Sequence, residues 1–265
     1  MRAVILSAGR GTRLHPYTEN TPKCLTELGG MTLIGRQVAT LRSGGVDDIV
    51  IAAGYKAKML ELPGTRMVLN PNWESTNMVE TLFCAEAEFG EEVIVSYGDI
   101  VYEPRVLAAL LTSRYEISVA VDKNWRAYWK HRFENPSSDA ESLRLDGAGR
   151  ITDIGNPVSD LDEVMAQYMG LMRFRGAGIT ALRTARDRFQ TVRRPWMEKR
   201  LPKQAYMTDL LMEMVLSGFD VHAVPVEGGW LEIDTVADYE SAVAMIAEGS
   251  IRRFFDPSTT PAEAA

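Results

Sequence analysis

Residues 6–25 read LSAGRGTRLHPYTENTPKCL and follow directly on the apolar start MRAVI. A short apolar run that ends in small, flexible residues is typical of a buried strand that enters a turn. Backbone N–H groups in a glycine-rich turn between a strand and a helix form an anion-binding concavity, to which a nearby helix N-terminus would add. Gly9 and Gly11 would let a phosphate chain approach the backbone, and Arg13 and Lys23 supply positive charge. The alternative is a plain strand-to-helix turn with solvated cations.

The rest of the N-terminal half repeats the strand-then-helix pattern. Apolar runs alternate with stretches whose apolar residues recur at helical spacing; the runs are AVILSA, DDIVIAAG, RMVLN and EEVIVSYGD, and the helical stretches are MTLIGRQVATLRSGG and MVETLFCAEAEF. This alternation predicts an α/β fold with a mainly parallel sheet wrapped by helices. We expect a single domain over residues 1–255, with a nucleotide half at about 1–115 and an acceptor side at about 116–240.

The C-terminal half has a different pattern of predicted segments. Residues 116–174 predict β-rich segments, with loops and a hairpin over 134–160 that form a small elaboration on the acceptor side. Residues 206–218 predict a helix, 220–234 a strand with a loop, and 235–249 a terminal helix capped by Thr235. The composition of residues 256–265 predicts a disordered tail.

Composition excludes several function classes. A net charge of −7 argues against a general nucleic-acid binder and confines any phosphate chemistry to a local site. Cys24 and Cys84 lie far apart and match neither a disulfide framework nor a zinc cluster. We find no signal sequence and no apolar run of membrane-spanning length, so we expect a cytoplasmic protein without a membrane partner. The sequence leaves its oligomeric state open; a homo-oligomer is compatible with it.

The opening loop matches neither of two known phosphate-binding patterns. The Walker pattern needs Lys-Ser or Lys-Thr behind its last glycine, and the dinucleotide pattern needs a third glycine where this chain has Arg13. The whole string of residues 6–25 instead resembles the signature of nucleotidyltransferases that activate sugar phosphates and related small phosphates, a Gly-x-Gly-Thr-Arg loop followed by Pro-Lys. The resemblance implies a Rossmann-like, three-layer mixed sheet with the nucleotide across its carboxyl edge.

The resemblance also assigns nucleotide contacts and a metal. Asp99 in VIVSYGDI and Asp234 in GGWLEIDT stand at the family's magnesium-binding positions, and hard carboxylate oxygens suit Mg²⁺. Lys23 and Arg13 would be the catalytic cations. The implied nucleotide-binding residues are Leu6, Ala8, Gly9, Gly11, Thr12, Arg13, Asn77 and Gly98, of which Ala8, Gly9 and Asn77 would read a pyrimidine. The sequence shows no evident Ser or Cys partner arrangement for His15, His131 or His222, so we expect no covalent intermediate.

An aromatic and basic segment points to the acceptor. In VDKNWRAYWKHRFENP, tryptophans stand among cations, where either core packing or contact with a substrate explains them. This segment, QYMGLMRF and WLEIDTVADYESA resemble the phosphocholine and phosphonate cytidylyltransferase branch of the family. That branch implies CTP as donor. From the residues themselves we expect the rings of Trp125, Trp129 and Tyr168, with Glu232 as counter-charge, to receive a cationic group of the acceptor, and Lys123 and Arg132 to bind its phosphate or phosphonate end.

The resemblance therefore implies transfer of CMP to a small phosphonate or phosphate acceptor, with release of pyrophosphate. Phosphocholine, aminoethylphosphonate, hydroxymethylphosphonate and other phosphonates all stay open as acceptors. A sugar-1-phosphate nucleotidyltransferase is the alternative within enzymes, although it would need hydroxyl-reading side chains where this chain has tryptophans. A nucleotide-binding regulator is the alternative outside enzymes, although it would not need Lys23, Asp99 and Asp234 together.

Overall fold

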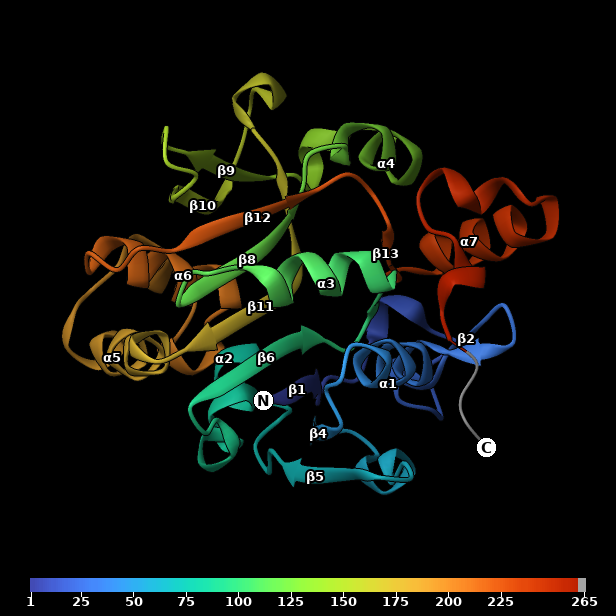
Figure 1. The fold of residues 1–265 in the computed structure, drawn as a ribbon, viewed down its shortest axis with the longest axis horizontal. Coiled ribbons are helices and arrows are strands. Elements are labelled where there is room, and N and C mark those ends of the chain that lie inside the picture. The colour runs from blue at the N-terminus through green and yellow to red at the C-terminus, as the bar shows by residue number, and fades with distance from the viewer. Residues whose placement is uncertain (262–265) are drawn as a thin grey trace.

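A seven-stranded mixed sheet forms the centre of the computed structural model, which describes residues 1–261 (Figure 1). The strand order is β12-β8-β11-β6-β1-β4-β5, and β11 is antiparallel to both its neighbours whereas the other pairs are parallel. The bounds are β1 Arg2–Ser7, β4 Asp48–Ala53, β5 Thr65–Leu69, β6 Glu92–Tyr97, β8 Ile117–Asp122, β11 Gln167–Arg175 and β12 His222–Val226.

Three short strand pairs and seven α-helices complete the fold of residues 1–261. The pairs are β2 Glu27–Leu28 with β3 Met31–Thr32, β7 Ile100–Tyr102 with β13 Trp230–Glu232, and β9 Glu141–Leu145 with β10 Ile151–Pro157. The helices are α1 Leu33–Ser43, α2 Met78–Cys84, α3 Pro104–Thr112, α4 Trp125–Arg132, α5 Ala177–Thr191, α6 Met207–Leu216 and α7 Val236–Glu248.

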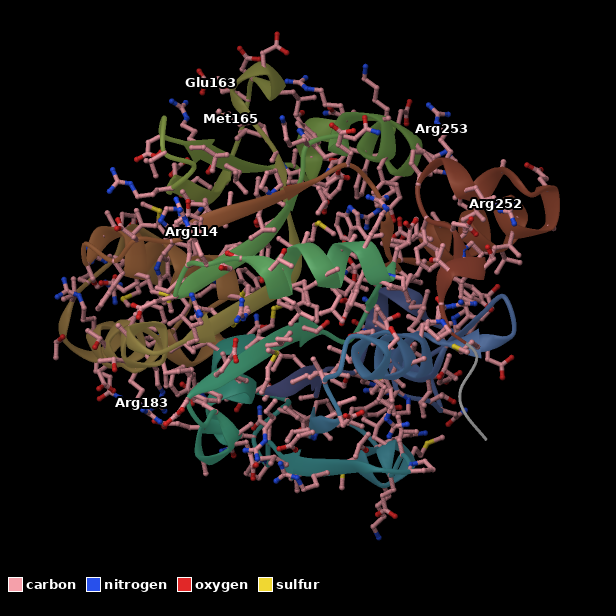
Figure 2. The ribbon with its side chains drawn as sticks, viewed as in Figure 1. Arg114, Glu163, Met165, Arg183, Arg252 and Arg253 are labelled. Atoms are coloured by element: carbon pink, nitrogen blue, oxygen red, sulfur yellow. The ribbon has the colours of Figure 1, made fainter. Side chains whose placement is uncertain are left out.

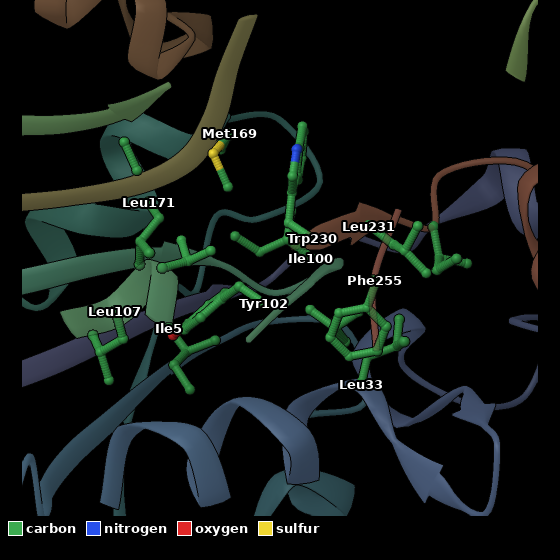
Figure 3. Close-up of a cluster of buried hydrophobic side chains, with 14 of the residues drawn as sticks. Ile5, Leu33, Ile100, Tyr102, Leu107, Met169, Leu171, Trp230, Leu231 and Phe255 are labelled. Carbon is green, nitrogen blue, oxygen red and sulfur yellow. The ribbon is translucent and has the colours of Figure 1, made fainter. Parts of the chain in front are cut away.

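The strands divide their apolar side chains between two cores. Ala3 and Ile5 of β1 belong to the cluster that contains α1, α3, α4 and α7, whereas Val4 belongs to the cluster with α2, α5 and α6. Successive residues of a strand face opposite sides, so each face of the sheet is covered by its own helices. Figure 3 shows part of the first cluster, where Tyr102 and Phe255 fill the space between the sheet and α1. The result is the three-layer, mainly parallel α/β architecture that the sequence predicts.

Several local predictions are confirmed. The hairpin within 134–160 is β9 and β10, and Thr235 caps α7, accepting a hydrogen bond from the Asp238 amide. The prediction of β-rich segments is wrong at residues 125–132, which form helix α4. Its buried residues Trp125, Tyr128 and Trp129 recur at the three- and four-residue spacing of one helix face, which packs into the core.

The expected disordered tail is also wrong where the structure describes it. Residues Pro257–Thr259 form a 3₁₀ turn, and the buried Arg36 donates to the Pro257 carbonyl at 3.3 Å and the Thr260 hydroxyl at 3.2 Å. These contacts dock residues 256–261 beside α1. Residues 262–265 of the expected tail lie outside the described residues.

Charged side chains cover the outside of the molecule. Figure 2 labels exposed examples on several elements, among them Arg183 on α5 and Arg252 beyond α7. Cys24 is buried and Cys84 exposed, and neither forms a disulfide. Within residues 1–261 we find no helix that is both long and apolar enough to cross a membrane.

Candidate active site

The glycine-rich turn leaves β1 at the carboxyl edge of the sheet. Its backbone is held from both sides, because the Tyr55 amide donates to the Ala8 carbonyl at 2.9 Å and the Gly98 amide to the Leu6 carbonyl at 3.0 Å. Gly11 has a φ of +66°, and a Cβ there would come within 2.8 Å of the Lys23 side chain. Glycine is therefore required at position 11 both for the left-handed backbone and for the close approach of Lys23.

The turn presents unpaired backbone donors. Within residues 1–261, the amides of Gly9, Gly11 and Thr12 donate to no other protein group. The expected helix behind the turn is a 3₁₀ turn, Thr12–Leu14, and α1 begins only at Leu33. The α-helix that begins at the pocket is instead α2, with Asn77 as its N-cap residue.

The turn that carries Asp99 depends on a close contact and on a buried glutamine. A Cβ at Gly98 would lie 2.4 Å from the Ser7 Oγ and 2.7 Å from the Leu6 carbonyl, so only glycine lets this turn pack against β1. Gln37 of α1 donates to the carbonyls of Tyr97 at 3.0 Å and Ile100 at 2.7 Å, one on each side of Asp99. Gln37 therefore fixes the direction in which the Asp99 carboxylate points.

Strand pairing brings the two aspartates together although 135 positions separate them in sequence, from 99 to 234. β7 and β13 pair antiparallel, and the Ile233 amide extends this ladder with a 2.9 Å hydrogen bond to the Asp99 carbonyl. Glu232 and Asp234 flank the buried Ile233 and point to the same side, as expected for alternate residues of an extended segment.

Lys23 lies between the two carboxylates. Its Nζ donates to Asp99 Oδ2 at 2.8 Å and to Asp234 Oδ1 at 2.6 Å, and all three side chains are largely buried. Burial alone would lower the pKa of Lys23, but the charges of Asp99 and Asp234 raise it above its ordinary value. Arg13, whose side chain is mostly exposed, pairs with the other carboxylate oxygen of Asp234. The ammonium group of Lys23 is therefore held charged at the edge of the pocket.

The same carboxylates fit a divalent cation. One ammonium group contacts both Asp99 and Asp234, so a single cation at this place reaches both carboxylates. Mg²⁺ is commonly held by one or two carboxylates, with phosphate oxygens and waters in the remaining positions. Within residues 1–261 there is no cluster of three metal-binding side chains, so further ligands would have to come from substrate and water.

A first pocket of about 260 Å³ opens above the glycine turn. All the nucleotide-binding residues expected from the sequence line it, as do Lys23, Asp99 and Asp234. Ser7 also lines the pocket, and its buried hydroxyl has no partner among the described residues. Sequence reasoning missed the following lining residues: Ser7, Cys24, Trp73, Thr76, Met78, Thr81 and Tyr97.

A second pocket of about 270 Å³ adjoins the first and shares Arg13, Met78, Tyr97 and Asp234 with it. Its walls come from elements far apart in sequence, namely α4, the hairpin, β11, the start of α6 and β13. The lining is aromatic and acidic; it contains the rings of Tyr97, Trp129, Tyr168, Tyr206 and Trp230 and the carboxylates of Asp139, Glu141, Glu232 and Asp234.

Three of the six expected acceptor-binding residues, Trp129, Tyr168 and Glu232, line this second pocket. The structure does not bring Lys123 or Trp125 to either pocket, because Lys123 is exposed and Trp125 lies in the core. Arg132 lies behind the pocket wall, where its side chain is 3% exposed and pairs with Glu232. Lys123, Trp125 and Arg132 therefore line neither pocket. Sequence reasoning missed the following residues: Asp139, Glu141, Gln167, Met169, Gly170, Tyr206, Thr208 and Trp230.

Burial raises the pKa of two carboxyl groups in the second pocket, Glu141 and Glu232. Burial raises the pKa of Glu141 to about 7, and the neighbouring charges of Asp139 and Asp209 add to the effect. Burial also raises the pKa of Glu232 to about 7, although Arg132 opposes this shift. Glu141 forms no ion pair within residues 1–261, so a cation that entered the pocket would neutralise a carboxylate that the protein leaves unpaired.

The fold, the glycine turn with free amides, and the lysine between two aspartates together define a nucleotidyltransferase. Comparison with known proteins agrees with this class. The chain belongs to the family of MobA-like NTP transferase domains, whose profile matches residues 3–159.

Three relatives illustrate the similarity. The chain is 32% identical over 251 residues to the CTP:phosphoglutamine cytidylyltransferase of Campylobacter jejuni, covering 91% of this chain and 98% of that protein. It is 26% identical over 255 residues to the CMP-5'-(3-aminopropyl)phosphonate synthase of Streptomyces rubellomurinus, covering 91% of this chain and 38% of that protein. Its fold resembles that of the CTP:phosphocholine cytidylyltransferase of Streptococcus pneumoniae, with a TM-score of 0.66, 21% identity, and coverage of 92% and 98%.

Proposed function

We propose that this protein is a magnesium-dependent cytidylyltransferase that transfers CMP from CTP to a small phosphate or phosphonate whose far end carries an ammonium group. The observation that carries the proposal is the second pocket. Lys23, which pairs with the shared residue Asp234, would face the anionic end of the acceptor where the pockets meet, whereas the second pocket offers carboxylates and aromatic faces and no cation except Arg13 among its described lining residues. Such a pocket complements an acceptor with an anionic and a cationic end.

The first pocket supports a nucleotide donor with a small base. Its volume of about 260 Å³ suits one ring, bounded by the turn at Ala8 and Gly9 and by Trp73. Amide and carbonyl groups of the turn, together with Asn77, would read the edge of a cytosine. The names of the three relatives, each a cytidylyltransferase or a CMP-transferring synthase, support CTP over other nucleotides.

The reaction is an in-line displacement at the α-phosphorus of CTP. An acceptor oxygen forms the new P–O bond, and the bond to the β-phosphate breaks as pyrophosphate leaves. Lys23 would stabilise the charge that develops around the α-phosphate, while Arg13 and the free turn amides hold the β- and γ-phosphates. Asp99 and Asp234 would hold Mg²⁺, which when bound neutralises phosphate charge. No protein nucleophile is needed.

The arrangement disfavours two other acceptors. A sugar phosphate carries no cationic group that would pair with the Glu141 and Glu232 carboxylates. An acidic phosphonate would rely on Lys123 and Arg132, but Lys123 is exposed outside the pocket and Arg132 is buried behind it. The carboxylates Glu141 and Glu232 would repel such an acceptor.

A pyrophosphate-release assay tests the proposal. CTP, UTP, ATP and GTP are each supplied with phosphocholine, aminoethylphosphonate, hydroxymethylphosphonate, phosphoglutamine and glucose 1-phosphate. We expect CTP to be preferred, and turnover with an amine-bearing acceptor to exceed turnover with hydroxymethylphosphonate or the sugar. Equal use of a purine triphosphate, or preference for the sugar phosphate, would overturn the proposal.

A further inference from the structure

Helix α4 holds Glu232 at two points. Tyr128 and Arg132 stand four residues apart and therefore share one helix face. The Tyr128 hydroxyl donates to the Glu232 carbonyl at 3.1 Å and accepts from the Glu232 amide at 3.0 Å. Arg132 Nη1 donates to Glu232 Oε2 at 2.6 Å. The helix thus fixes both the backbone and the carboxylate of this acceptor-pocket residue.

The other edge of the Arg132 guanidinium is anchored on α7. Its Nε donates to Asp238 Oδ1 at 2.9 Å and its Nη2 to Asp238 Oδ2 at 3.1 Å. Asp238 Oδ2 also accepts from the backbone amides of Asp234 at 3.1 Å and Thr235 at 2.8 Å. One carboxylate therefore anchors both Arg132 and the backbone that carries Asp234.

The ion pair of Arg132 and Asp238 is almost completely shielded from solvent. The side chains of Arg132 and Asp238 are each 3% exposed, and the guanidinium carbon lies 5.3 Å from the Trp129 ring centroid and 5.4 Å from that of Tyr128. The planar guanidinium group of arginine can hydrogen-bond two carboxylates at once. The single ammonium group of lysine is less well suited to this bridging. Arg132 does not line the acceptor pocket, so any effect on the acceptor passes through another residue.

We propose that Arg132 is a positioning residue that fixes the Glu232 carboxylate toward the cationic end of the acceptor. This inference rests on the proposed function. It differs from a purely electrostatic role, in which Arg132 would compete with the acceptor's ammonium group for Glu232. If Arg132 competes with the acceptor for Glu232, removing its charge should lower the acceptor KM. If Arg132 positions Glu232, removing it should raise the acceptor KM.

Steady-state kinetics of Arg132→Lys, Arg132→Met, Glu232→Gln and the double variant Arg132→Lys/Glu232→Gln separate these roles. Arg173→Lys is the matched control, because Arg173 is a buried, ion-paired arginine outside both pockets, with a side chain that is 7% exposed. We expect both Arg132 variants to raise the acceptor KM by about tenfold while the CTP KM changes by less than about twofold. In the Glu232→Gln background, Arg132→Lys should add less than about twofold, since coupled residues are not additive. Arg173→Lys should leave both KM values unchanged.

Three results would overturn the inference: a lower acceptor KM in Arg132→Met, an undiminished effect of Arg132→Lys in the Glu232→Gln background, or a CTP KM that rises as much as the acceptor KM. A wild-type enzyme that releases no pyrophosphate would instead refute the proposed function. A crystal structure of Arg132→Met tests the inference in that case too. Glu232 rotated away from the second pocket supports the inference, whereas an unmoved Glu232 contradicts it.

Discussion

The two pockets are built in different ways. The opening loop of residues 6–25 supplies half of the residues that line the first pocket, and the pocket's lysine and aspartates pair with one another. The second is formed by side chains from many separate elements, and its Glu141 carboxylate has no cationic partner among the described residues. A loop of fixed backbone suits the triphosphate that all nucleotide donors share. Side chains on separate elements can change one at a time, so we propose that the second pocket selects the acceptor.

The largest expected effect concerns the aspartates at the junction of the pockets. Asp99→Asn and Asp234→Asn should each abolish magnesium-dependent turnover, because a neutral amide is a poor ligand for a divalent cation. Pyrophosphate release across a Mg²⁺ titration measures the loss, and thermal unfolding checks that the fold persists. Near-normal rates at low Mg²⁺ in either variant would show that these carboxylates do not hold the metal.

Removing the charge of Lys23 should have the next largest effect. Lys23→Ala should lower kcat by about a hundredfold or more, because one preorganised charge at a phosphoryl transition state contributes a few kcal/mol. Lys58→Ala, at an exposed position outside both pockets, is the control. A kcat that stays within about threefold of wild type would remove Lys23 from the chemical step.

A smaller effect should be confined to the second pocket. Trp129→Ala should cost about 1–2 kcal/mol of acceptor affinity, the range for a desolvated cation–π contact, while the CTP KM stays the same. Phe133→Ala, a substitution of an aromatic residue that lines neither pocket, is the control. If the CTP KM rose as much as the acceptor KM, the two pockets would not act separately.

The smallest effect is a pH dependence. The pKa of Glu141 is raised to about 7, so its carboxylate loses its charge as the pH falls below 7 while an amine acceptor stays protonated. We expect the acceptor KM to rise several-fold from pH 8 to pH 6, with little change in the CTP KM, and Glu141→Gln to weaken this dependence, the remainder coming from Glu232, whose pKa is also raised to about 7. A dependence that Glu141→Gln leaves unchanged would assign it to another group.

The raised pKa of Glu141 also has a consequence for stability. A carboxyl group whose pKa is higher in the folded than in the unfolded protein favours folding at low pH, and this contribution is lost as the pH rises through about 7. Glu141→Gln should therefore raise the melting temperature at pH 8 more than at pH 5. A carboxylate kept at some expense to stability is expected at a binding site.

Much of the first pocket could be predicted from the sequence because its signals are local. The loop of residues 6–25 contains the turn, Arg13 and Lys23, and apolar alternation predicts the strands that carry it. Asp99 and Asp234 were found only by resemblance, since their proximity depends on the pairing of β7 with β13. Gln37, which orients the Asp99 turn, gave no local signal in the middle of an amphipathic helix.

The second pocket shows why the remainder could not be predicted. Asp139, Glu141 and Tyr206 reach it from the hairpin and from the start of α6, and only the packing of these elements brings them together. In α4, the three-residue spacing of Trp125 and Tyr128 is that of one buried helix face, so Trp125 packs in the core rather than against the acceptor. The charge of Arg132 predicts a contact with the acceptor. In the structure its side chain is instead buried and pairs with Glu232 and Asp238.

The most direct test of the central claim compares two acceptors that differ in one group. Aminoethylphosphonate and propylphosphonate have nearly the same size, but only the first ends in an ammonium group. With CTP and Mg²⁺ at pH 8, we expect kcat/KM to be at least about tenfold higher for aminoethylphosphonate, because one desolvated cation–π or charge-assisted contact contributes about that factor. Equal kcat/KM values for the two acceptors, or a preference for propylphosphonate, would contradict it.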